Sequence, residues 1–210
     1  MPKREHSKED RLIKFLREHN CTFYSPLSQN DTSDWMSGNA MVKYGNDSVV
    51  WENNVGMYKF KLASGQSYGT NQYYAKWNLT DTIVQSQMNL TTVALTYSDT
   101  TQNCFYDFFP TRIGISLTTF STTTGDKSKS AQVFTTVNNI SHQKVFVDGV
   151  EALDYNYNRA YNFFNGSTGV RIGCPTNSSY ATTYCMQHFA LFTQALSLDE
   201  INEYFNIVTT

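Results

Sequence analysis

From residue 21 to the C-terminus, the chain is a succession of short stretches in which apolar and polar residues alternate, separated by turn-forming residues. Alternation with a period of two is typical of β-strands that are covered on one face. Residues 87–97 and 112–120 show it most regularly. Roughly ten to twelve such strands are expected, and so many short strands pack as two sheets. The sequence therefore predicts an all-β fold, a two-sheet antiparallel jelly-roll sandwich.

Two local signals set the position of a turn and of a helix. Asp148 and Gly149 tolerate the positive φ angles that a type I′ turn requires, and strand-forming residues flank them on both sides. Near the C-terminus, Ser197 and Glu200 have the spacing of a capping box, with apolar residues following at helical intervals. We therefore predict a hairpin over residues 144–151 and a short amphipathic helix near the C-terminus.

The first twenty residues differ from the rest because charged residues dominate them. Ser7 and Asp10 resemble a helix start, and four apolar residues follow at helical spacing. The chain is thus divided into a charged helix in residues 1–20 and a β-sandwich in residues 21–210. The apolar residues need a covering surface, which is either their own domain or another subunit that the helix anchors or oligomerises. They are Leu12, Ile13, Phe15 and Leu16.

The overall charge excludes several classes of partner. The formal net charge is −2 and charged residues make up 16% of the chain, so no general attraction to nucleic acid or an anionic membrane is expected. No apolar run reaches the roughly 18 residues of a membrane span. No apolar segment follows the basic residues at the N-terminus, so we predict no signal peptide and synthesis in a cytoplasm.

Three stretches, in this order, resemble laminin-G-like domains of the concanavalin A-like lectin and glucanase superfamily. They are residues 22–27 followed by Asp34, the Val-Asp-Gly hairpin at residues 145–150, and the closing segment at residues 189–204. Residues 170–173 resemble the strand that lies between the last two in that family. The resemblance covers most of residues 22–208. It implies a jelly-roll fold and recognition of carbohydrate or protein.

Catalytic patterns are missing from the sequence. Glucanases of the superfamily place three carboxylates on one strand face as Glu-x-Asp-x-Glu, which does not occur here. Glu52 and Glu151 are the glutamates of the β-region, and neither has an acidic residue two positions away. The four histidines are scattered, with no readable triad. We predict a protein that is not an enzyme, with a glycan-processing enzyme dependent on Glu52 or Glu151 as the third hypothesis.

Metal binding is predicted only weakly. The cysteines lack the C-x-x-C spacing of zinc sites. Asp31 and Asp34 are candidate calcium ligands because family members bind calcium at the rim, although the chain lacks an Asp-x-Asp-x-Asp spacing. The alternative is that both are ordinary turn aspartates. No other cofactor is expected.

Aromatic residues are enriched, with 14 Tyr, 14 Phe and 3 Trp. Two groups of them lie among asparagines, and flat rings with neighbouring amides suit sugar rings and their hydroxyl groups. The alternative is that they are tyrosines of strand edges or protein contacts. The candidate ligand-binding residues are Asn71, Tyr73, Tyr74, Trp77, Tyr155, Tyr157 and Asn158.

The leading hypothesis is a virion surface protein of a bacterial virus: a head-decoration, head-fibre or tail-appendage subunit. Its partners would be other virion proteins through the N-terminal helix, a second copy of the chain, and host or mucosal glycans. The second hypothesis is a capsid or tail protein that cements its neighbours and binds no sugar.

Overall fold

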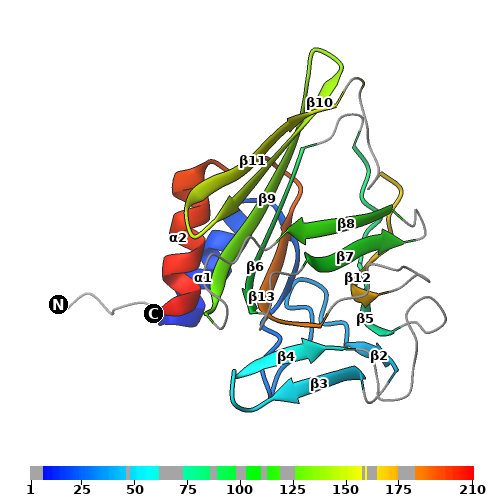
Figure 1. The fold of residues 1–210 in the computed structure, drawn as a ribbon, viewed down its shortest axis with the longest axis vertical. Helices are drawn as coiled ribbons and strands as arrows, with labels where there is room; N and C mark the ends of the chain where they lie inside the picture. The colour runs from blue at the N-terminus through cyan, green and yellow to red at the C-terminus, as the bar shows by residue number, and fades with distance from the viewer. Residues whose placement is uncertain are drawn as a thin grey trace.

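β13 (Tyr184–Phe192) pairs with three strands inside the larger of two antiparallel sheets in the computed structural model (Figure 1). The structure describes residues 7–45, 48–61, 73–85, 89–97, 103–109, 113–118, 126–157, 159, 165–174 and 183–210. One side of β13 pairs with β6, and the other side pairs first with β4 and then with β1. The strand order of this first sheet is β11 (Val150–Asn156), β10 (Ile140–Val147), β9 (Ser128–Val137), β6 (Leu90–Tyr97), β13, β4 (Met57–Phe60) and β3 (Val49–Glu52), with β1 (Cys21–Ser25) beside β13.

A second antiparallel sheet packs against one face of the first. Its strand order is β2 (Val42–Tyr44), β5 (Tyr73–Asn78), β12 (Gly169–Cys174), β7 (Asn103–Phe109) and β8 (Ile113–Thr118). The core between the sheets is rich in large aromatic side chains, whose burial contributes about 2–3 kcal/mol each. The largest are Phe23, Phe60, Trp77, Phe134, Tyr184 and Phe189. The predicted two-sheet antiparallel sandwich is confirmed.

Two helices cover the other face of the first sheet and create a second core (Figure 1). α1 (Lys8–Glu18) and α2 (Leu198–Thr209) lie side by side. Each begins at a serine whose side chain accepts a hydrogen bond from the backbone three residues on, with the acidic side chain there completing the capping box. Both predicted helix starts are therefore confirmed, at Ser7 and at Ser197.

The apolar face of α1 packs on its own domain. Leu12, Phe15 and Leu16 are buried, and Ile13 is partly buried. The Phe15 ring contacts Phe192 of β13 edge-on, with ring centres 6.0 Å apart. For these residues the first of the two alternatives therefore holds, because they complete the second core of their own domain, and an anchoring or oligomerising contact of α1 would have to use its outer face. α1 belongs to the β-domain and is not a separate part.

Hairpin turns hold β9, β10 and β11 together. Asp148 and Gly149 have φ angles of 51° and 81°, as the predicted type I′ turn requires. Asn138 and Asn139 adopt φ angles of 51° and 61° between β9 and β10. The two tight turns place β11 at the open edge of the first sheet, where it carries the residues described next.

Candidate glycan-recognition surfaces

Two tyrosines predicted as ligand contacts lie together at the end of β11. Tyr155 and Tyr157 are two residues apart, so they lie on the same side of the strand. Their ring centres are 4.8 Å apart at an angle of 80°. Tyr155 is 51% exposed and Tyr157 is partly buried. The edge of the first sheet thus presents one accessible aromatic ring supported by a second ring.

The neighbouring strand β10 holds this pair in place. The Tyr157 hydroxyl donates a hydrogen bond to Gln143 Oε1 at 2.6 Å, and the Tyr157 backbone N–H donates to the Ser141 carbonyl at 2.8 Å. Gln143 lies directly opposite Tyr155 in the strand register. The hydrogen bonds restrain the Tyr157 ring, whereas Tyr155 can meet a ligand. We call Gln143, Tyr155 and Tyr157 the tyrosine edge.

Charged residues lie on the opposite side of β11 from the tyrosine edge. Lys144 Nζ is 2.8 Å from Glu151 Oε2 and 3.3 Å from Asp154 Oδ2. Hydrogen bonds to these two carboxylates raise the Lys144 pKa. Asp154 precedes Tyr155, so their side chains point to opposite faces. The three residues of the tyrosine edge therefore carry no charge, and they offer aromatic faces, hydroxyl groups and an amide.

The second predicted cluster is divided by the alternation of β5. Trp77 is fully buried between the sheets, and its Nε1–H donates to the Thr32 carbonyl at 2.8 Å. Its prediction as a sugar contact is therefore wrong, because the ring is part of the core. Tyr74 is only 8% exposed, with Tyr44 stacked on it at 4.4 Å between ring centres. The prediction that the Tyr74 ring offers an open face to a sugar is therefore also wrong, because Tyr44 covers it.

Three further candidates cannot be placed in a surface. Tyr73 lies in β5, but its side chain is outside the described residues, as are Asn71 and Asn158. Tyr44, by contrast, is a residue that the sequence reasoning missed. It lies in the three-residue strand β2 and is 42% exposed. The alternation of Val42 and Tyr44 before Gly45 is the signal that could have found it.

The two candidate calcium ligands organise the loop after β1. Asp31 accepts hydrogen bonds from the Ser33 backbone and hydroxyl and from Trp35 Nε1. Burial acts to raise the Asp31 pKa, but these hydrogen bonds outweigh it and lower the pKa. Asp34 accepts from the Tyr24 backbone N–H at 3.0 Å, and burial raises its pKa. Across the described parts of the chain, no three His, Cys, Asp or Glu side chains converge as metal ligands would.

The two glutamates of the β-region are far apart. Glu52 is on β3 and Glu151 on β11, at opposite edges of the first sheet. Six strand spacings of about 4.8 Å separate these edges by roughly 29 Å, whereas glycosidase carboxylates are about 5–9.5 Å apart. Each glutamate also has a lysine partner, with Lys59 3.0 Å from Glu52. These two residues therefore cannot form a glycosidase pair.

Comparison with known proteins finds likeness in structure only. No protein-family model and no curated protein matches the sequence. One similar structure is of botulinum neurotoxin type C, whose cell entry is described as dependent upon interaction with two ganglioside molecules. Its TM-score is 0.63 at 9% identity, and the match covers 94% of this chain and 53% of that chain. The botulinum neurotoxin type G receptor-binding domain has a TM-score of 0.62 and 9% identity, covering 90% and 51%.

The binding domain of botulinum neurotoxin DC, in complex with rat synaptotagmin II, is also similar. Its TM-score is 0.61 at 11% identity, and the match covers 90% of this chain and 52% of that chain. This chain thus spans about half the length of each of these structures. At such identities the likeness shows a shared β-sandwich fold. Within the described parts of the chain, we find no helix with the length and apolar character needed to cross a bilayer.

Proposed function

We propose that this protein is a non-enzymatic recognition domain that binds glycans through the tyrosine edge. The observation that carries the proposal is the half-exposed Tyr155 ring beside the restrained Tyr157 ring, at an open sheet edge. The proposal is supported by the similar folds, since cell entry of one of these neurotoxins is described as dependent upon interaction with two ganglioside molecules. It is also supported by the separation of Glu52 and Glu151, which removes the glycosidase arrangement considered from the sequence.

The chemistry of the tyrosine edge suits a neutral sugar face. The apolar C–H face of a pyranose ring stacks on an exposed aromatic ring, while hydroxyl and amide groups exchange hydrogen bonds with sugar hydroxyls. Tyr155 supplies the ring, and Tyr157 and Gln143 supply polar groups at its border. A single exposed ring makes few contacts with a sugar, so we expect weak binding to each copy. Strong attachment then requires several copies acting together.

The test is a glycan array followed by titration of the best ligand with the intact chain. Tyr155→Ala should weaken binding about tenfold, which corresponds to about 1.4 kcal/mol. Val150→Ala is the matched control, because it removes another exposed apolar side chain from the same strand, β11, at a residue outside the tyrosine edge. Equal binding by wild type and Tyr155→Ala would remove the tyrosine edge from the proposal.

For the biological setting, we propose attachment to the surface of a virion. This is supported by the arrangement of layers. Tyr155 lies opposite Gln143, and Gln143 lies opposite Phe134 of the inter-sheet core, so all three are on the same side of the first sheet. The helices cover the other side of that sheet. A particle could therefore be contacted on the helical side while the tyrosine edge faces outward. Mass spectrometry of purified virus particles tests the setting, and absence of the chain from them would reject it.

The second candidate is a capsid or tail protein that cements neighbouring subunits. It is supported by the same open edges and by the similar domain seen in complex with another protein, rat synaptotagmin II. The two candidates differ in the array experiment, since a cementing protein binds particle proteins and no sugar. Retention on glycan-free particles, unchanged by Tyr155→Ala, would favour this candidate.

A further inference from the structure

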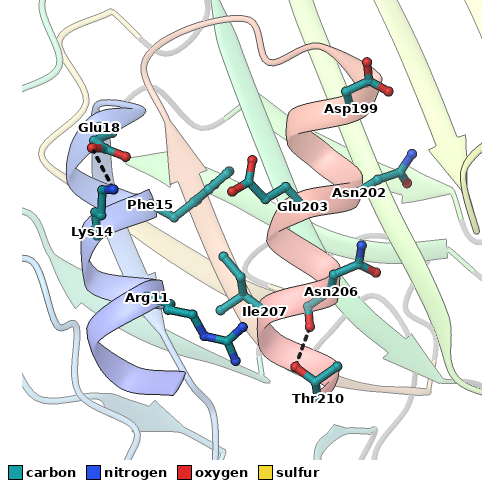
Figure 2. A pocket seen from close by; sticks show the side chains of 10 residues that line it. All are labelled: Arg11, Lys14, Phe15, Glu18, Asp199, Asn202, Glu203, Asn206, Ile207 and Thr210. Atoms are coloured by element: carbon teal, nitrogen blue, oxygen red, sulfur yellow. Dashed lines mark hydrogen bonds and ion pairs between the residues drawn. The ribbon is translucent and has the colours of Figure 1, made fainter. Parts of the chain in front are cut away.

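A groove of about 500 Å³ runs between α1 and α2 on the outer face of the helical layer (Figure 2). Its apolar floor is formed by Phe15 and Ile207, which are almost completely covered by the domain. Its two sides are formed by exposed charged and polar side chains, one side from each helix. Because the floor is small and the sides are charged, electrostatics must dominate recognition here.

The two sides of the groove carry opposite charge. The α1 side contributes Arg11 and Lys14, with Glu18 at its end, while the α2 side contributes Asp199 and Glu203. α2 contains acidic residues and no Lys or Arg. Figure 2 shows the side chains of Arg11 and Glu203 extending into the gap from opposite helices.

These charges are not neutralised across the groove. Lys14 pairs with Glu18 along α1 at 3.8 Å, with both side chains well exposed. Arg11, Asp199 and Glu203 form no ion pair within 4.0 Å with any residue that the structure describes. A basic stripe therefore lies beside an acidic stripe, and both can accept a partner of opposite charge.

We propose that the groove is the contact surface of a weak symmetric dimer, with a second copy of this chain as its occupant. A two-fold interface uses the same patch on both copies, so the patch must complement itself. Rotation about an axis along the groove, parallel to both helices, places each α1 over the α2 of the other copy. Basic stripes then meet acidic stripes twice. Lys14 is level with Glu203 in Figure 2, so these two residues form the central contact between copies.

The size of the patch sets the strength of this dimer. Helices of 11 and 12 residues are about 17 Å long, and two side by side are about 20 Å wide, which gives a footprint of about 340 Å². Stable interfaces bury about 800 Å² on each partner. We therefore expect a dissociation constant of roughly 100 μM. We also expect dissociation at high salt, because exposed charges are screened.

The test is sedimentation equilibrium of the intact chain from about 10 μM to about 1 mM, at low and high salt. Lys14→Glu and Glu203→Lys should each weaken self-association roughly tenfold, since the two-fold axis repeats every new repulsion. The double variant Lys14→Glu/Glu203→Lys should restore it by exchanging the partners. Arg17→Glu is the matched control, because it makes the same charge change on α1 at a residue that does not line the groove.

Each outcome decides the proposal. A wild-type chain that stays monomeric throughout the concentration range overturns it. So does a double variant as weak as the single variants, or an Arg17→Glu effect equal to that of Lys14→Glu. If a single variant fails to fold, loss of the wild-type dimer at high salt supports the proposal and persistence of the dimer refutes it. Glycan binding by the monomer is independent of all these results.

Discussion

His188 should make the stability of this protein depend on pH, because it is held neutral inside the fold. It lies in β13 at the point where the strand changes partner from β4 to β1, with a φ of 52° and an interrupted register to β6. Nδ1 is 2.7 Å from the Tyr24 hydroxyl, and the His188 carbonyl accepts from the Tyr204 hydroxyl at 2.6 Å. Burial raises the Tyr24 pKa, so its hydroxyl stays protonated and can donate to Nδ1 of the neutral ring.

Protonation of this ring would place a charge in the protein interior. Burial lowers the His188 pKa from 6.5 to about 4, with a further contribution from the positive charges of Lys8 and Lys127. The unfolded chain therefore binds a proton at a higher pH than the folded chain, and stability falls as the pH drops through this window. The loss from this residue is about 2 kcal/mol between pH 7 and pH 5, and about 3 kcal/mol by pH 4.

His188→Asn isolates the effect. Asparagine tolerates positive φ, and its Oδ1 can accept the Tyr24 hydrogen bond in place of Nδ1. The free energy of unfolding of both proteins is measured by urea titration at pH 7, 6 and 5. The variant should be less stable at pH 7 because the ring packing is lost. The wild type should nevertheless lose about 2 kcal/mol more than the variant on going to pH 5.

The difference between the two proteins is the informative quantity, because carboxylates titrate in both. Equal losses between pH 7 and pH 5 would show that the His188 ring is solvated or already charged in the folded state. NMR titration of the ring gives the same answer directly. A midpoint near 6.5 would refute the reasoning.

Three further predictions concern the core, the helix start and the loop after β1. Trp77→Ala should lower the free energy of unfolding by about 3–5 kcal/mol, whereas Tyr155→Ala should change it by less than about 0.5 kcal/mol, as measured by urea titration. Ser197→Ala removes the cap of α2 and should cost about 1 kcal/mol, visible as a lower melting temperature, while Ser197→Asp should retain most of it. Asp31 and Asp34 serve as hydrogen-bond acceptors, so neither calcium nor EDTA should change the melting temperature. If calcium raised the melting temperature of the wild type but not of Asp31→Asn, that result would identify a calcium site there.

Some predictions succeeded because they depend on neighbours along the chain. Ser7 and Ser197 cap helices because the side chain three residues on is within reach of the cap. Asp148 and Gly149 form their turn because these residue types tolerate positive φ. Alternation likewise predicted strands at β1 and β9, since successive side chains point to opposite faces whatever the partner strand is.

Tertiary pairing decided the burial of β6. All but the last of its residues are buried, although alternation had suggested one covered face. The helices cover one side of the first sheet and the second sheet covers the other. Buried threonines remain satisfied there: Thr91 Oγ1 donates to the Gln194 carbonyl and accepts from the Leu196 N–H, both at 2.9 Å. A polar residue in a strand therefore did not mark solvent exposure.

The sequence by itself determined most of the strands, though not β2 or β7, together with the predicted turn, the helix starts and the absence of a glucanase motif, because each depends on residues close together in the chain. Only the tertiary structure decided that Trp77 lies inward, that Tyr155 lies outward beside Gln143, and that α1 covers its own domain. The alternation of apolar and polar residues in a strand indicates which side chains lie on the same face of the sheet. Which face is covered depends on contacts between segments as far apart as α1 and α2, whose pairing no local pattern encodes.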